Sequence, residues 1–209
     1  MSEMPPRGEF PTIPPDSILS MSLVFYGFMY FLAVIIAWLR EAREFINPCT
    51  AEALFWGALL GLAVAILSRP LKWFAAFDSM YKVLGKILGP QDAWTCAALA
   101  LSSGFAEEAL FRGALQPWFG IYVTAALFGL VHSPVLLPDD AGEIKEALGI
   151  WPLFAFVVGL AFGYLTIYTK TWLSAAAAHG MVNYLNLRFI CGNEALHAGS
   201  GTEDDSGIS

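Results

Sequence analysis

Long apolar blocks dominate this chain and restrict its possible folds more than any other feature. An α-helix needs about 20 mostly apolar residues to cross the hydrocarbon core of a bilayer. Six blocks approach or exceed that length, at residues 18–39, 51–67, 93–117, 120–137, 150–168 and 171–190. Overall 57% of the residues are hydrophobic and only 14% are charged, whereas about a quarter are charged in a typical soluble domain. The sequence therefore predicts an all-α, polytopic membrane helical bundle with about six transmembrane helices.

The segments outside these blocks predict the remaining organisation. Residues 1–17 are polar and rich in proline, and residues 191–209 are polar and acidic, so we expect both to be disordered. Residues 70–90 carry apolar side chains at helical spacing, with lysines on the opposite side. This pattern predicts one interfacial amphipathic helix. Residues 18–190 are then expected to form a single transmembrane domain.

Pairs of glycines four residues apart predict where helices pack closely. Gly57 and Gly61 lie in the second block, and Gly159 and Gly163 lie in the fifth. Small residues at this spacing allow the backbones of two membrane helices to approach each other.

Charge and cysteine usage exclude several functions. The net charge is −7, acidic residues gather near both ends, and no basic stripe is present, so nucleic acid is not an expected partner. The three cysteines are widely spaced and form no Cys-x-x-Cys pair, which argues against a disulfide framework and a thiolate metal site. With six spans, most basic loop residues fall on the side of the N-terminus, so we expect both termini in the cytoplasm.

Polar residues inside three of the apolar blocks form the second strong feature. An ionisable group in hydrocarbon costs at least about 2.5–3.5 kcal/mol and usually serves a function. The clusters are Glu107, Glu108 and Arg112 in the third block, His132 in the fourth, and His179 with Asn183 in the sixth. Helix rise and alternating span direction place Glu107, His132 and His179 in one layer of the membrane. We therefore expect these side chains to converge on one site.

Spacing within the clusters predicts different roles for the two glutamates. Residues four apart share a helix face, so Glu108 and Arg112 are expected to form a buried ion pair. Glu107 points elsewhere and has no partner on its own helix, which suits a general base. His179 and Asn183 also share a face and are able to donate hydrogen bonds to a developing oxyanion.

Other mechanisms find less support in the sequence. No His-Glu-x-x-His zinc motif is present, and no aspartate lies inside any of the six blocks. A serine mechanism would pair Ser103 with His179, but Leu101 stands where a nucleophile elbow has glycine. The non-enzymatic alternative is a proton-coupled transporter or a scaffold, although the inverted repeats expected of a transporter are not visible. The remaining mechanism is hydrolysis by a water molecule that glutamate and histidine activate, with or without a metal.

The three clusters together resemble a known family. The order Glu-Glu-x-x-x-Arg, Phe-x-x-x-His and His-x-x-x-Asn on successive membrane helices is similar to the CPBP (Abi) intramembrane proteases, which include the type II CAAX prenyl endopeptidases. The matching positions are Glu107, Glu108 and Arg112, then Phe128 and His132, then His179 and Asn183. The resemblance covers about residues 93–190, which we take as the expected catalytic core.

The resemblance implies a glutamate-dependent endopeptidase acting within the membrane. The expected catalytic residues are Glu107, His132, His179 and Asn183, and the expected supporting residues are Glu108, Arg112 and Phe128. Glu107 and His132 would orient and deprotonate a water molecule. His179 and Asn183 would hold the tetrahedral oxyanion.

Metal, substrate and location are further expectations. The family is sometimes described as metalloproteases, and Glu107, His132 and His179 would supply three zinc ligands with water as the fourth. We favour a metal-free site without a cofactor, because Asn183 is a poor zinc ligand but a good oxyanion donor. The expected partners are membrane lipid and a membrane-anchored or prenylated protein substrate. The expected location is the bacterial inner membrane, as a multi-pass protein.

Overall fold

The computed structural model describes residues 15–134, 145–146 and 148–200, and every regular element within them is helical. The long helices are α1 (Pro15–Leu39), α2 (Ala51–Ser68), α3 (Ala75–Leu88), α4 (Ala93–Glu108), α5 (Gln116–Val131), α7 (Trp151–Thr169) and α8 (Trp172–Ser200). Short elements are η1 (Arg43–Ile46), η2 (Arg69–Trp73) and the π-helical η3 (Ala109–Leu115). The predicted all-α polytopic bundle is confirmed.

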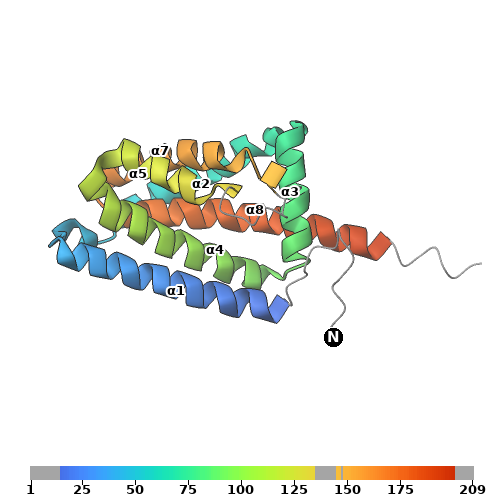
Figure 1. The fold of residues 1–209 in the computed structure, drawn as a ribbon, viewed down its shortest axis with the longest axis horizontal. Coiled ribbons are helices and arrows are strands. Elements are labelled where there is room, and N and C mark those ends of the chain that lie inside the picture. The colour runs from blue at the N-terminus through green and yellow to red at the C-terminus, as the bar shows by residue number, and fades with distance from the viewer. Residues whose placement is uncertain (1–14, 135–144, 147, 201–209) are drawn as a thin grey trace, which may run out of the picture.

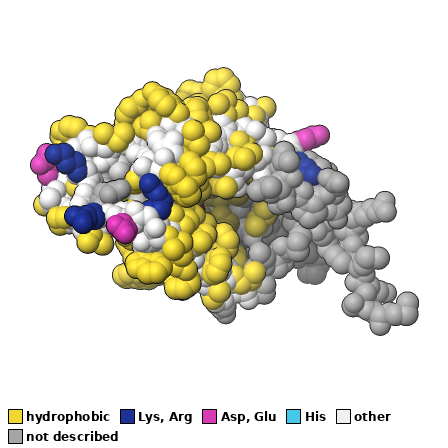
Figure 2. Space-filling view, turned by 60° about the vertical axis from the view of Figure 1, so that its left-hand side comes forward, with side chains coloured by type: hydrophobic (Ala, Val, Ile, Leu, Met, Phe, Trp, Pro, Cys, Tyr) yellow, Lys and Arg dark blue, Asp and Glu magenta, His cyan; other side chains and the backbone are white. Residues whose placement is uncertain are grey.

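The bundle has an apolar surface of the kind that faces lipid. Four helical segments of the described chain are long and apolar enough to cross a membrane, namely Ser17–Leu39, Ala51–Trp73, Ala93–Val131 and Trp151–Thr169. On α1, Val24 is 75% exposed and Phe28 is 66% exposed. Figure 2 shows hydrophobic side chains over much of one face, with a group of charged side chains near one end. An apolar surface of this extent marks an integral membrane protein.

The predicted third and fourth blocks are joined end to end. The apolar run Ala93–Val131 passes through α4, η3 and α5. It is interrupted at Gly120, where a φ of 77° breaks the helical geometry. Glycine adopts this left-handed region without a steric penalty. The expected boundary near residue 120 is thus confirmed, while residues 135–137 of the fourth block lie outside the described residues.

Helix α8 occupies a central position in the bundle. It packs against α4 and α2, and also contacts α7 and α3, and Figure 1 shows it between the flanking helices. Ala175, Ala178 and Val182 are buried within a core cluster together with Val158 and Phe162 of α7. This central position is what allows α8 to present side chains to a site between helices.

The expected ends of the transmembrane domain need correction. Helix α8 continues to Ser200, so the prediction of disorder is wrong for residues 191–200. Glu194, Ala195 and Leu196 are good helix formers, and no proline follows Ile190 to end the helix. Helix α1 also begins slightly earlier than expected, at Pro15. The remaining predicted tails, residues 1–14 and 201–209, lie outside the described residues.

Both predicted glycine pairs lie at close helix contacts. A Cβ added to Gly61 would lie 2.5 Å from the carbonyl oxygen of Ala178 on α8, and one on Gly57 would collide with the carbonyl of Ser174. A Cβ on Gly163 would lie 2.7 Å from Cγ1 of Ile121 on α5. The first pair therefore joins α2 to α8, and the second pair joins α7 to α5.

Helix α3 crosses the other helices near one end of the bundle (Figure 1). Met80 is buried, whereas the ion pair between Lys82 Nζ and Asp78 Oδ2, 2.7 Å apart, is exposed. The Phe77 ring packs on Phe154 of α7 with centroids 6.0 Å apart. The amphipathic helix expected within residues 70–90 is therefore present, and its crossing direction suits a helix that lies along the membrane interface.

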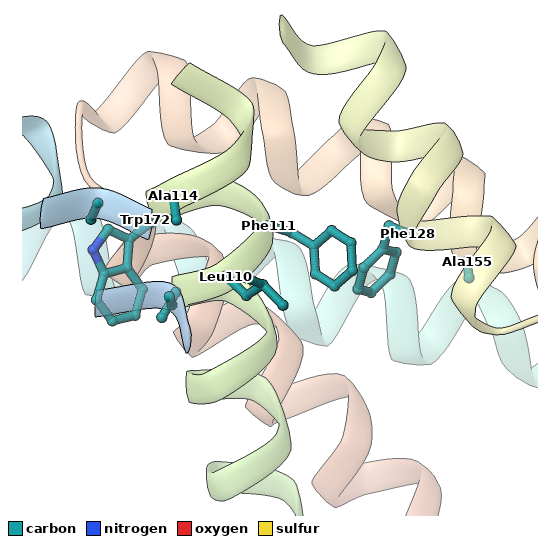
Figure 3. Close-up of a cluster of buried hydrophobic side chains, with 9 residues drawn as sticks. Leu110, Phe111, Ala114, Phe128, Ala155 and Trp172 are labelled. Atoms are coloured by element: carbon teal, nitrogen blue, oxygen red, sulfur yellow. The ribbon is translucent and has the colours of Figure 1, made fainter. Parts of the chain in front are cut away.

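A core cluster surrounds η3 and fixes its position. Its members are Ala33, Ala37, Ala109, Leu110, Phe111, Ala114, Phe128, Ala155 and Trp172. Figure 3 shows the Phe111 and Phe128 rings facing one another between their helices, with centroids 5.0 Å apart and an interplanar angle of 84°. This edge-to-face contact holds η3 against α5.

Candidate active site

Three parts of the bundle bring the predicted polar residues together. Glu107 and Glu108 end α4, Arg112 lies on η3, His132 follows α5, and His179 with Asn183 lie on α8. The expected convergence of these helices is therefore present.

The π-helical turn directly after Glu108 was not predicted. The sequence indicated a continuous α-helix through residue 117, yet Ala109–Leu115 is π-helical. Such turns are rare in proteins, but those that occur are often found at functional sites. Arg112 lies within this turn, and its side chain still reaches back to Glu108, four residues earlier.

Glu108 is held by two basic side chains. Its Oε1 atom lies 3.0 Å from Arg112 Nη1, and both side chains are completely buried. The same oxygen lies 2.8 Å from His179 Nδ1. The predicted Glu108–Arg112 pair is present, and His179 joins it from α8. Charge-assisted hydrogen bonds of this kind are stronger than neutral ones.

The Arg112 guanidinium is fixed further by α5 and α7. Its Nη2 donates to the carbonyl of Gly159 at 2.9 Å, and its Cζ lies 4.3 Å from the centroid of the Phe128 ring. A Cβ on Gly159 would lie 3.1 Å from Arg112 Nη2. Gly159 thus leaves room for the guanidinium as well as allowing close helix packing.

Glu107 faces His132. The Oε2 atom of Glu107 lies 3.7 Å from His132 Nε2. Within the described residues, this buried oxygen has no hydrogen-bond partner. The other ring nitrogen, Nδ1, lies 2.7 Å from the carbonyl oxygen of Phe128. A carbonyl only accepts, so Nδ1 carries a proton, and in the neutral ring Nε2 presents its lone pair to Glu107.

Phe128 therefore has two contacts that explain its spacing from His132. Its carbonyl, four residues before the histidine, sets the imidazole tautomer, and its ring lies over Arg112. Both contacts come from one buried residue. They suit the supporting role that the sequence suggested.

Asn183 makes a contact that sequence reasoning missed. Its Nδ2 donates to Ser103 Oγ at 2.9 Å, and Ser103 in turn donates to the carbonyl of Ala100 at 3.2 Å. Ser103 lies four residues before Glu107, so the two share a face of α4. That spacing was the available signal for Ser103. The expectation that His179 and Asn183 aim freely at one point is thus incomplete, because each already has a partner.

Tyr26 is a second residue that sequence reasoning missed. It lies on α1, where its half-buried side chain comes near Glu107 and Ser103 of α4. No local pattern links Tyr26 to residues some eighty positions later. Its position depends on how α1 packs against α4, which only the structure shows.

The backbones of α4 and α8 approach closely beside these residues. A Cβ on Gly104 would lie 2.7 Å from the backbone nitrogen of Gly180. Gly104 follows Ser103, and Gly180 follows His179. Two glycines thus bring the Ser103–Asn183 and Glu108–His179 contacts within hydrogen-bonding distance.

The three side chains of the zinc alternative are divided between two contacts in the described part of the chain. There, no three His, Cys, Asp or Glu side chains come together as a possible metal-binding group. Glu107 and His132 face each other, while His179, the third ligand of the zinc alternative, contacts Glu108 through Nδ1 and keeps Nε2 free of a hydrogen bond within the described residues. The metal-free site and its zinc alternative both stay predictions.

A cavity of about 440 Å³ lies near the site but does not coincide with it. Arg112 lines it, together with residues of α5, α7 and the start of α8, among them Gln116, Thr166 and Trp172. None of Glu107, His132, His179 and Asn183 lines it. The polar cluster is therefore packed between helices rather than placed at the bottom of this cavity.

Comparison with known families agrees with the motifs. Residues 89–185 match the family model described as type II CAAX prenyl endopeptidase Rce1-like. The matched segment includes Glu107, Glu108, Arg112, His132, His179 and Asn183, and it excludes α1 with Tyr26. No curated protein and no solved structure matches the chain. The match confirms the family resemblance seen in the sequence.

Proposed function

We propose that this protein hydrolyses a peptide bond of a prenylated, membrane-anchored protein, since residues 89–185 match the family model described as type II CAAX prenyl endopeptidase Rce1-like. Water activated by Glu107 and His132 is the nucleophile. One observation supports this most strongly. Glu107 Oε2 and His132 Nε2 face each other 3.7 Å apart, with the imidazole tautomer fixed by Phe128.

Two acceptors that face each other suit a water molecule that donates one proton to each. The water lies to one side of the line between them, with a lone pair directed toward the substrate carbonyl. As the oxygen bonds to the carbonyl carbon, Glu107 accepts a proton from the water. Glu107 then transfers this proton to the nitrogen of the leaving amine as the C–N bond breaks. The first-formed products are a free amine and a carboxylic acid that carries the second water proton. The acid then gives this proton to His132, which releases it to solvent, and a carboxylate remains.

The oxyanion is proposed to bind between Asn183 and His179. The Asn183 amide has two N–H groups, and its bond to Ser103 uses only one. His179 donates through Nδ1 to Glu108, and Nε2 makes no hydrogen bond within the described residues. A protonated His179 then offers its Nε2–H to the oxyanion.

The local charge balance supports a protonated His179. With both carboxylates ionised, Glu107, Glu108 and Arg112 carry one unbalanced negative charge in a buried region. An uncompensated buried charge is strongly unfavourable. Protonation of His179, which contacts Glu108 directly, neutralises the cluster. Burial away from water also strengthens each of these interactions.

The proposal is tested with the purified protein in detergent or proteoliposomes. The substrates are a farnesylated peptide that ends in a CAAX sequence and the same peptide without the lipid. Mass spectrometry of the products is expected to show release of the three terminal residues from the farnesylated peptide. Cleavage at that bond should depend on the lipid. Intact farnesylated peptide after prolonged incubation with folded protein would contradict the proposed substrate class.

A further inference from the structure

The cavity of about 440 Å³ beside the candidate site lies where α5 begins, α7 ends and α8 begins. Asn47, in the connection between α1 and α2, also lines it. These segments meet at the end of the bundle away from α3 (Figure 1). The volume is within the range of about 300–1,000 Å³ that is usual for ligand sites. The proposed hydrolysis does not use this space, so the cavity is free to serve a second ligand.

This end of the bundle has the aromatic surface of a membrane interface. Trp38 lies in the last turn of α1, Trp118 in the first turn of α5 and Tyr168 in the last turn of α7, and all three are exposed. Exposed Trp and Tyr side chains gather at the level of the lipid headgroups. Pro117 and Ile167, their neighbours in sequence, line the cavity. The cavity therefore lies at headgroup depth.

The lining of the cavity suits an anion. Lys170 and Arg112 line it, and the described lining residues include no Asp or Glu. Lys170 ends α7 and is exposed. Helix α8 begins at Trp172, and both Trp172 and the preceding Thr171 line the cavity. The first amides of a helix carry the positive end of its dipole and lack partners within the helix, an arrangement that binds phosphate groups.

The Arg112 side chain gives an independent indication of a ligand. It is 2% exposed. Its Nη1 donates to Glu108 and its Nη2 donates to the carbonyl of Gly159. Its Nε is buried and has no hydrogen-bond partner within the described residues, although leaving a buried donor unpaired is costly. Because Arg112 lines the cavity, an anionic oxygen bound there would supply the acceptor.

We propose that this cavity binds a phosphate group between Lys170, Arg112 and the N-terminus of α8. The phosphate belongs to an anionic phospholipid headgroup or is free phosphate. Glu108 already offsets the charge of Arg112, so Lys170 supplies the positive charge that a phosphodiester monoanion balances. The acyl chains of a lipid would lie along exposed apolar side chains such as Ile167. This site is separate from the proposed peptidase reaction and does not depend on it.

The test measures lipid binding to the purified, delipidated full-length protein by native mass spectrometry. The probes are dioleoylphosphatidylglycerol and dioleoylglycerol, which has the same chains without the phosphate. Lys170→Gln is expected to weaken phosphatidylglycerol binding by about 10-fold, the scale of one lost charge-assisted hydrogen bond. Arg43→Gln is the matched control, because Arg43 is an exposed cation of the neighbouring η1 that does not line the cavity. It should leave binding unchanged.

A second pair of variants tests the cavity without changing its charge. Ile167 and Leu153 both lie on α7 and are both 58% exposed, but only Ile167 lines the cavity. Ile167→Trp narrows the cavity and should weaken binding by a similar factor, whereas Leu153→Trp should not. Full binding to either Lys170→Gln or Ile167→Trp would overturn the proposal. So would equal losses in Lys170→Gln and Arg43→Gln, or equally tight binding of dioleoylglycerol.

Competition by inorganic phosphate identifies the source of the phosphate group. Once binding is shown to depend on Lys170, displacement of the lipid by inorganic phosphate would support the site and assign it to free phosphate. Retention of the lipid would support the site and assign it to the headgroup. Neither result depends on peptide cleavage, so an inactive protein would contradict the proposed function and leave this measurement valid.

Discussion

Glu107 and Glu108 are adjacent in sequence but have different surroundings. Glu108 contacts Arg112 and His179, and it is completely buried. Glu107 faces His132. Helical spacing was sufficient to predict the Glu108–Arg112 pair and the separation of Glu107 from it. The contact between Glu108 and His179 was not predictable, because the rotation of α8 relative to α4 is set by packing.

The Glu108–Arg112 ion pair is expected to stabilise the folded state as a unit. Replacing one partner, by Glu108→Gln or Arg112→Leu, leaves the other charge buried and should lower the free energy of unfolding by about 3–5 kcal/mol. The double variant should lose less than the two single losses combined. Unfolding of all four proteins in detergent measures the coupling. Strictly additive losses would show that the two side chains do not interact.

Asn183 is expected to act on turnover more than on stability. If its second N–H binds the oxyanion, Asn183→Ala should lower kcat by about 10²–10³-fold. An interhelical hydrogen bond alone would instead contribute about 0.6–2 kcal/mol to stability and leave turnover per folded molecule unchanged. Ser103→Ala is the matched control, because it removes the partner at 2.9 Å and keeps the amide. Equal kcat losses in both variants would contradict the oxyanion role.

At the scale of elements, the site depends on the approach of α4 to α8 and on the π-helical turn that follows α4. The two predicted glycine pairs were found at helix contacts, because small residues at a spacing of four are a clear signal. Gly104 and Gly180 gave no such signal, since neither has a second glycine four residues away. The π-helical turn in η3 was also missed, because its residues favour an ordinary α-helix equally well.

Gly104→Ala tests whether this close approach is needed. The added Cβ would lie 2.7 Å from the Gly180 nitrogen, so the helices must separate. Overpacking of this kind typically costs about 1–3 kcal/mol, and we expect kcat to fall with it. Gly192→Ala on α8 is the control, because nothing lies within 4 Å of its added Cβ. It should leave kcat unchanged and stabilise the helix by up to about 1 kcal/mol.

Activity and unfolding midpoint are measured for both glycine variants in the same detergent. The pair of measurements separates a local effect of the methyl group from a general effect of replacing glycine. A fully active and stable Gly104→Ala protein would show that α4 and α8 have more space between them than the structure indicates.

At the scale of the whole molecule, lipid takes the place of water as the main solvent. The long apolar blocks made the fold class predictable from the sequence, since few arrangements satisfy the backbone in hydrocarbon. The sequence was less informative about the helix ends, and α8 extends beyond its expected limit to Ser200. It also gave no indication that α1 approaches the site. Such long-range packing follows from the shapes of all the helices together.

Metal removal tests the chemistry of the whole protein. Because the proposed mechanism activates water with Glu107 and His132 alone, we expect exhaustive chelation to leave cleavage of the farnesylated peptide intact. Elemental analysis of the purified protein should find no stoichiometric zinc. If chelation abolished activity and zinc alone restored it, Glu107, His132 and His179 would have to rearrange into ligands, and the metal-free mechanism would be wrong.

The central claim is that Glu107 is the base that activates water, and one measurement tests it most directly. Glutamine has almost the shape of glutamate but does not accept the proton, so Glu107→Gln isolates this role. The single-turnover rate of farnesylated-peptide cleavage is compared with wild type, after both proteins are shown to have the same unfolding midpoint. The mechanism predicts a loss of about 10²–10⁴-fold, the usual scale for general-base catalysis. A near-normal rate in the folded Gln variant would contradict it.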